Sequence, residues 1–189
     1  FKAIGNDETS LGKNYVLGAN IDLGGEEITP IGNYANPFTG KFSGNGHTVS
    51  NFTINQPDEN NIGLFGYNNG TIMNLGVEKA EINGYEFVGG VCGYTDGVTI
   101  QNCYNTGAVK GENDVGGVCG YNYSGGTIKN CYNTGTVNGN GEDIGGVCGY
   151  SYGGTITNSY NIGNVSGTDY VGGVCGYNNT GCTIQNCYN

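Results

Sequence analysis

Apolar residues in this chain come in short runs bounded by Gly or Asn, and the same runs return at a nearly constant interval. The stretch GGVCGY occurs four times, and its tyrosines, which follow one another by 27, 29 and 27 residues, are Tyr94, Tyr121, Tyr150 and Tyr177. A second stretch, TIxN followed by Cys or Ser and then Tyr, recurs with an unchanged step of 28 residues. β-Branched and aromatic residues in runs of this length, separated by turn-forming residues, predict short strands rather than helices.

A unit of this size cannot bury its apolar side alone, so we expect each unit to stack on its neighbours and build a continuous core. The sequence predicts an all-β fold, a right-handed parallel β-helix (β-solenoid) of about six to seven coils of roughly 28 residues, each with about three short strands. Residues 1–60 are expected to form degenerate N-terminal coils, and residues 61–189 regular repeats of the same domain that stop within a repeat.

One column of the repeat alignment predicts a corner between two strands. Asn tolerates left-handed backbone conformations, and stacked amides can bond one another along a rod. Placing residues 40–54 without gaps on residues 63–77 extends the column upstream and puts Phe42 and Phe65 in the column of the GGVCGY cysteines. The predicted structural column is then Asn51, Asn74, Asn102, Asn130, Asn158 and Asn186.

The repeat unit, G-[LV]-x-G-x-N followed by G-T-I-x-N-[CS]-Y, resembles the GLUG-type repeat, and GLFGYNNGTIMN at residues 63–74 matches it best. Residues 30–54 are similar to the stretch that often precedes these repeats. The resemblance implies β-helical repeats of bacterial surface or secreted proteins, including adhesin-like proteins and the non-catalytic parts of M26-type IgA peptidases. It therefore implies an extracellular location, and it carries no catalytic role for this segment.

Charge narrows the function further. The formal net charge is −10, with 6 basic residues, so the basic surface that nucleic acids require is missing. No apolar run approaches the roughly 18 residues of a membrane span, so we expect no direct membrane insertion. The single histidine, His47, lies outside any HExxH pattern, and no GxSxG is present. We expect no enzyme in this fragment, whereas the parent protein could still be a metallopeptidase.

The eight cysteines allow three interpretations: apolar core fillers, disulfide partners, or metal and redox centres. Cys103 aligns with Leu75, and the GGVCGY cysteines align with phenylalanine, which favours buried fillers. The C-x2-C spacing of zinc sites is absent. If a disulfide exists, the candidate pair is Cys175 with Cys182, seven residues apart across a turn.

The tyrosines form two columns. The first alternates with inward-facing Cys103 and Asn105, so it should face outward and is the candidate ligand-binding surface for a host protein or glycan. Its members are Tyr104, Tyr132, Tyr160 and Tyr188. The orientation of the second stays open, because strict alternation sends Tyr94 inward unless a kink at Gly93 resets it. That column is Tyr67, Tyr94, Tyr121, Tyr150 and Tyr177.

Acidic residues recur shortly before each Gly–Gly pair, at Glu86, Asp114, Glu142, Asp143 and Asp169. Carboxylates at one corner could hold Ca²⁺, but the Gly-Gly-x-Gly-x-Asp pattern of calcium-binding solenoids is absent. A solvated turn without a cofactor is the preferred interpretation.

The expected function is a non-catalytic scaffold or stalk of a bacterial cell-surface or secreted protein, acting in adhesion or in binding a host protein or glycan. Neighbouring domains of the parent chain are expected partners. The alternative is an accessory β-helical segment of an M26-type IgA peptidase whose catalytic domain lies outside this fragment.

Overall fold

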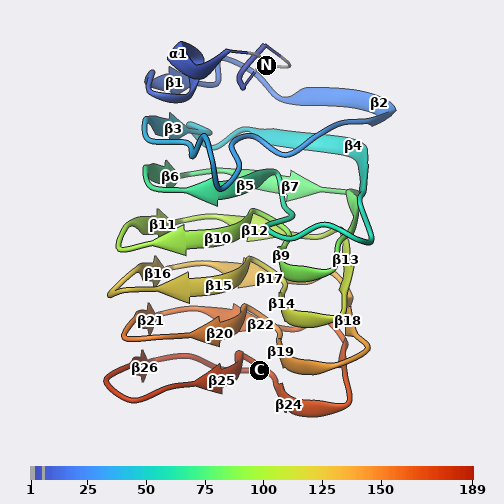
Figure 1. The fold of residues 1–189 in the computed structure, drawn as a ribbon, viewed down its shortest axis with the longest axis vertical. Helices are drawn as coiled ribbons and strands as arrows, with labels where there is room; N and C mark the ends of the chain where they lie inside the picture. The colour runs from blue at the N-terminus through green and yellow to red at the C-terminus, as the bar shows by residue number, and fades with distance from the viewer. Residues whose placement is uncertain (1–2, 6) are drawn as a thin grey trace.

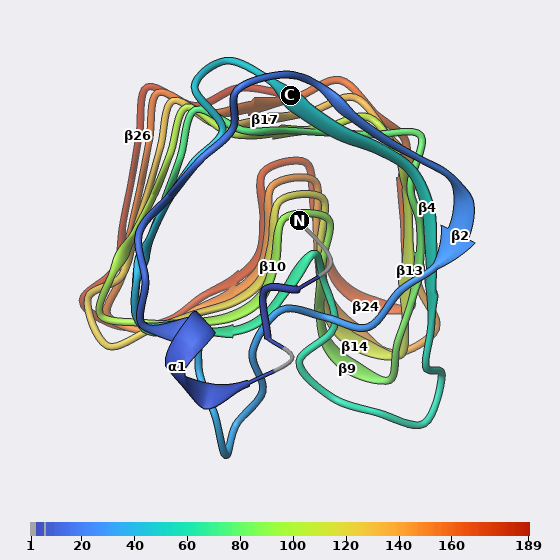
Figure 2. The ribbon, with the colours of Figure 1, turned by 90° about the horizontal axis from the view of Figure 1, so that it is seen from above.

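The computed structural model describes residues 3–5 and 7–189, which form one stack of parallel coils (Figure 1). Equivalent strands of successive coils pair in register, so that Ile100 lies between Ile72 and Ile128. Seen from above, the chain runs clockwise as it descends from its N-terminal to its C-terminal coils, which is a right-handed path (Figure 2). The predicted parallel β-solenoid is therefore confirmed. Helix α1 (Glu8–Leu11) has four residues, and none of the described residues forms a helix long and apolar enough to cross a membrane.

Four parallel sheets line the stack. The seven-stranded sheet contains β1 (Tyr15–Val16), β3 (Lys41–Ser43), β6 (Thr71–Met73), β11 (Thr99–Gln101), β16 (Thr127–Lys129), β21 (Thr155–Thr157) and β26 (Thr183–Gln185). The five-stranded sheet contains β5 (Phe65–Asn68), β10 (Cys92–Asp96), β15 (Cys119–Tyr123), β20 (Cys148–Ser151) and β25 (Cys175–Asn178).

The other two sheets complete each coil. The ten-stranded sheet contains β2 (Ile21–Glu27), β4 (Thr48–Asn55), β7 (Gly76–Glu78), β8 (Glu81–Asn83), β12 (Tyr104–Asn105), β13 (Ala108–Gly111), β17 (Tyr132–Asn133), β18 (Val137–Gly139), β22 (Tyr160–Asn161) and β23 (Val165–Ser166). The four-stranded sheet contains β9 (Glu86–Gly89), β14 (Asn113–Gly116), β19 (Glu142–Gly145) and β24 (Asp169–Gly172). Strand β4 pairs with both β7 and β8 and so joins two sides of the coil.

Each regular coil folds back into its own interior, a feature that we call the infold. The connection between β9 and β10 reaches the middle of the coil, and the equivalent connections below it do the same (Figure 2). A Cβ atom on Gly93 would lie 2.5 Å from the backbone nitrogen of Ile62, so the two arms of the infold approach at backbone distance. The sequence predicted about three strands per coil, whereas β9 to β13 give five, because the infold adds a second pair of arms.

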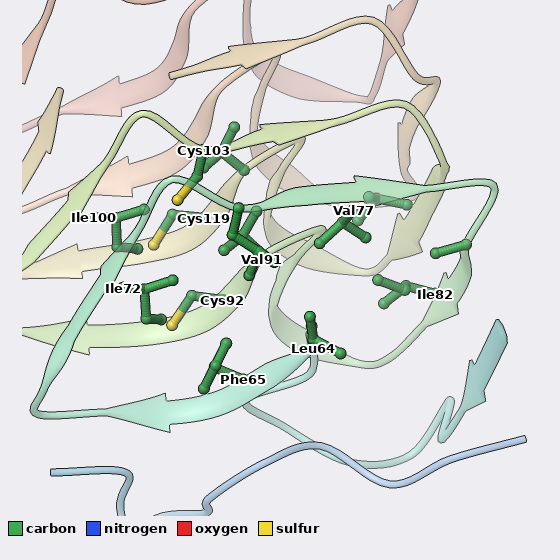
Figure 3. Close-up of a cluster of buried hydrophobic side chains, with 14 of the residues drawn as sticks. Leu64, Phe65, Ile72, Val77, Ile82, Val91, Cys92, Ile100, Cys103 and Cys119 are labelled. Atoms are coloured by element: carbon green, nitrogen blue, oxygen red, sulfur yellow. The ribbon is translucent and has the colours of Figure 1, made fainter. Parts of the chain in front are cut away.

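The core consists of apolar columns that continue from coil to coil. Phe65, Cys92 and Cys119 occupy one column beside Ile72 and Ile100 (Figure 3). All five side chains are fully buried. Because each column is filled by residues of similar polarity in every coil, the coils stack in one register.

The register predicted for the first coils is wrong. Phe42 lies opposite Ile72, not in the cysteine column, and Thr48 lies opposite Gly76. The true step between these coils is thus 28 residues there too, and Asn51 falls at a different corner from Asn74. The gapless alignment failed because Gly40–Phe42 imitates the Gly63–Phe65 stretch, although the first precedes a strand of the seven-stranded sheet.

The remaining members of the asparagine column do form a corner. Asn74, Asn102, Asn130, Asn158 and Asn186 all have φ between 49° and 54°. Each amide nitrogen donates to the amide oxygen of the preceding coil, at 2.8 Å for Asn102 to Asn74 and 3.0–3.3 Å for the others. Asn51 also has a positive φ, but its amide donates to the Asp22 carboxylate. We call the five residues in register the asparagine ladder.

Candidate binding surface

Tyr104, Tyr132, Tyr160 and Tyr188 form a stack that we call the outer tyrosine ladder. Their strands alternate buried and outward positions, since Cys103 and Asn105 on either side of Tyr104 are fully buried. Successive rings are 4.8–5.0 Å apart and within 4° of parallel. Tyr188 is exposed and the other three are half-buried. The predicted candidate residues are therefore brought together as one continuous aromatic surface, although their ligand remains a matter of proposal.

The ladder has a polar contact at its upper end. The Tyr104 hydroxyl donates to Oε1 of Glu78 at 2.6 Å. Burial, followed by this bond and the Glu78 charge, raises the pKa of Tyr104 above its ordinary value. The hydroxyl therefore stays protonated at physiological pH and can orient the ring.

The second tyrosine column also faces outward, at the mouth of the infold, and we call it the groove ladder. Tyr67, Tyr94, Tyr121, Tyr150 and Tyr177 stack at 4.5–5.1 Å. Cys92 and Thr95 are both buried while Tyr94 is half-exposed, so the alternation is interrupted at Gly93. Phe87 on the opposite arm packs edge-on against Tyr94 and Tyr121, at 5.6 and 5.1 Å. The side chains that oppose the groove ladder thus come from the four-stranded sheet.

Two acidic residues occupy the position of Phe87 in the next two coils, namely Asp114 and Asp143. Both have positive φ. They are only 7% and 8% exposed, and Oδ1 of each lacks a hydrogen-bond partner among the described residues. The expectation of a solvated turn is therefore wrong for these two carboxyls. Burial, together with the neighbouring carboxylates, raises the pKa of Asp114 to about 8 and that of Asp143 to about 6.

The cysteines are held as free thiols. Five are fully buried, namely Cys92, Cys103, Cys119, Cys131 and Cys148. Burial raises the pKa of Cys119 and Cys148 well above the ordinary thiol value, which disfavours the reactive thiolate.

Cys175 and Cys182, the candidate disulfide, are separate thiols in the structure. The Cys175 sulfur donates to the carbonyl of Tyr177 in its own strand, at 3.2 Å. The Cys182 sulfur donates to the carbonyl of Ser151 in the preceding coil, at 3.1 Å. The two side chains therefore bond to different coils, and the bridge is not formed.

Catalytic and metal chemistry find little support in the geometry. Nδ1 of His47 lies 3.1 Å from Oδ1 of Asn20, an amide that cannot act as an acid or base. Over the described residues, no group of three or more His, Cys, Asp or Glu side chains could hold a metal ion.

Sequence reasoning missed three residues beside the ladders: Gly76, Glu78 and Phe87. The register of the tyrosine column already places Gly76 above Tyr104, so the interruption of the column was readable from the alignment. The contact of Phe87 with the groove ladder was not readable, since it depends on the infold.

Comparison with known proteins supports this architecture. The family described as the GLUG motif matches residues 111–138 and 140–166, so the chain contains GLUG-motif repeats and the predicted resemblance is confirmed. Halomucin of Haloquadratum walsbyi is 40% identical over 100 residues, 47% of this chain and 1% of that protein. A protein described as a candidate Gly-rich membrane protein of Evansella cellulosilytica is 48% identical over 61 residues, 31% of this chain and 7% of that protein. The chain thus spans only a small part of either curated relative.

One solved structure is similar over nearly the whole chain. It is a protein described as a candidate immunoglobulin A1 protease from Bacteroides ovatus, with a TM-score of 0.81 and 30% sequence identity. The similarity covers 96% of this chain and 61% of that one. The β-helical fold is therefore shared with part of a larger protein.

Proposed function

We propose that this β-solenoid is a non-catalytic scaffold of a bacterial cell-surface or secreted protein and that it binds a host protein or glycan through the outer tyrosine ladder. The observation that carries the proposal is the stack of four tyrosine rings at 4.8–5.0 Å on one side of the rod. Aromatic rings with an exposed edge and a polar hydroxyl are enriched in binding surfaces because one end is apolar and the other is hydrated. The names of the relatives, halomucin and a Gly-rich membrane protein, agree with a surface location.

The rigidity of the rod supports the same role. Every coil is tied to the next by parallel strand pairing and by the asparagine ladder. A binding surface on such a rod repeats at the spacing of the coils, so several weak contacts can act together on a repetitive ligand. This arrangement suits a partner with repeating chemistry, such as a glycan chain.

The test compares the 189-residue protein with the double variant Tyr104→Ala/Tyr132→Ala on a glycan array and in pull-downs from host secretions. We expect a loss of at least tenfold in the bound signal, because two adjacent rings disappear. Tyr85→Ala is the matched control, since Tyr85 is a 46% exposed tyrosine outside both ladders. Equal binding by the double variant and the wild-type protein would count against the proposal.

A second candidate function is an accessory β-helical segment of an immunoglobulin A peptidase. The similarity to the Bacteroides ovatus protein, 30% identical over 96% of this chain, favours it. Its test is the sequence of the complete gene: an HExxH motif outside the 189 residues would support this role, and further repeats with a surface anchor in place of such a motif would contradict it.

A further inference from the structure

The outer tyrosine ladder ends abruptly at Tyr104. The next position in its column is Gly76, and the one beyond is Thr48. A Cβ atom at Gly76 would lie 2.4 Å from Cζ of Tyr104, so the Tyr104 ring lies directly over this glycine. Tyr104 therefore stacks on Tyr132 with one face, and no ring of a described residue stacks on the other.

A cavity of about 260 Å³ lies at this end of the ladder, and we call it the ladder slot. It is lined by Gly46, Asn74, Leu75, Gly76, Asn102 and Tyr104. Small-molecule pockets usually measure roughly 300–1,000 Å³, so the ladder slot has room for a single ring. The space exists because two glycines stand where other coils carry larger residues.

The asparagine ladder ends at the same place. Oδ1 of Asn74 accepts from the amide of Asn102 at 2.8 Å, whereas Nδ2 of Asn74 finds no acceptor among the described residues. The register shift of the first coils causes this, because Asn51 lies at another corner and bonds Asp22. The ladder slot thus combines one unstacked aromatic face with an amide that has a hydrogen bond to give.

We propose that the ladder slot binds one neutral pyranose ring, stacked on the free face of Tyr104. The C–H groups on one face of a sugar are complementary to the negative face of an aromatic ring. Hydroxyls at the sugar's edge can accept from the Asn74 amide. Glu78, 2.6 Å from the Tyr104 hydroxyl, and the net charge of −10 disfavour acidic sugars. This inference rests on the proposed function and narrows it to one end of the ladder.

The experiment is saturation-transfer difference NMR on the 189-residue protein with methyl glycosides of glucose, galactose, mannose and N-acetylglucosamine at millimolar concentration. We expect strong saturation of the ring C–H protons of at least one glycoside. Tyr104→Ala should reduce the signal at least tenfold, and Tyr104→Phe, which keeps the ring, should preserve it. Circular dichroism and a melting curve establish that each variant is folded.

Two further variants separate the ladder slot from the ladder as a whole. Gly76→Tyr continues the column into the slot and should abolish the signal, while Tyr160→Ala removes a ring far from the slot and should leave it unchanged. If Gly76→Tyr still binds and Tyr104→Ala/Tyr132→Ala does not, the slot inference is overturned and the ladder function stands. Absence of saturation in the wild-type protein overturns the slot inference alone, because larger glycans and proteins are tested separately on the array and in pull-downs.

Discussion

The N-terminal coils and the repeats that follow build the same core from different materials. Phe65 packs against the rings of Phe38 and Phe42, with centroids 5.1 and 5.2 Å away. In the next coil the position of Phe65 is taken by Cys92, and further coils continue with cysteine. One region thus fills its interior with aromatic rings and the other with small thiols.

A second exchange compensates for the first. Val77 lies opposite Asn105, and the column continues with Asn133, Asn161 and Asn189. The buried Asn105 amide donates to Asn133 at 2.9 Å, and Asn133 donates to Asn161 at the same distance. We call this column the inner asparagine ladder.

The infold turn changes together with these residues. The coil of Phe65 has Gly63 alone at the turn, while the later coils have Gly–Gly, and a Cβ on Gly90 would lie 2.5 Å from Cγ of Asn105. The comparison teaches that a solenoid position tolerates an apolar or a polar filler, provided that the fillers around it change with it.

The largest effect that this comparison predicts is in the N-terminal region. Phe65→Ala should lower the free energy of unfolding by about 3–5 kcal/mol, since it removes a fully buried ring. Cys119→Ala, the matched change in the repeats, should cost only about 1 kcal/mol because it removes a single atom. Urea unfolding followed by circular dichroism measures both. Similar losses for the two variants would show that filler volume does not distinguish the regions.

The inner asparagine ladder should matter less than the aromatic rings but more than the outer corner. Asn133→Val, which installs the residue type of Val77, removes hydrogen bonds to Asn105, Asn161 and Gly135. We expect a loss of about 2–3 kcal/mol, because buried polar partners lose their bonds.

The control for Asn133→Val is Asn130→Gly, which removes an exposed amide while keeping a residue that accepts the positive φ. It should cost less than about 1 kcal/mol in the same urea titration. The idea that the repeats rely on interior hydrogen bonds fails if Asn133→Val is as stable as the wild-type protein.

The smallest predicted effect concerns the infold, where Phe87 gives way to Asp114 and Asp143. The folded-state pKa of Asp114, about 8, lies above the ordinary value of 3.8. The folded state therefore binds more protons between these two pH values, so its stability is highest at low pH and falls as the pH rises towards 8. Asp143, with a pKa of about 6, adds to the fall between pH 4 and 6.

Asp114→Asn should flatten this dependence. We expect the variant to exceed the wild-type protein by about 1 kcal/mol at pH 8 and to approach it at pH 5. Melting temperatures between pH 5 and pH 8 measure the slope. Asp169→Asn, at an exposed position of the same sheet, is the control and should leave the slope unchanged; an unchanged slope in Asp114→Asn as well would contradict the burial of its carboxyl.

Much of the candidate surface could be predicted from the sequence. The constant 28-residue step fixed which residues stack, and alternation around Cys103 and Asn105 placed Tyr104 outside. The free face of Tyr104 could also be inferred once Gly76 was aligned with it. The first coils were harder, because one three-residue resemblance around Phe42 outweighed the true register in a gapless alignment.

The sequence by itself determined the period, the parallel stacking, the right-handed coil and the asparagine corner at Asn102. Each of these depends on local preferences that repeat in every coil, so repetition makes them legible. Only the tertiary structure decided the infold, the outward turn of Tyr94 and the burial of Asp114. These depend on a backbone contact between two arms of the infold, where Gly93 meets Ile62. A contact between strands that are not neighbours in a sheet leaves no period of its own in the sequence, and so no pattern predicts it.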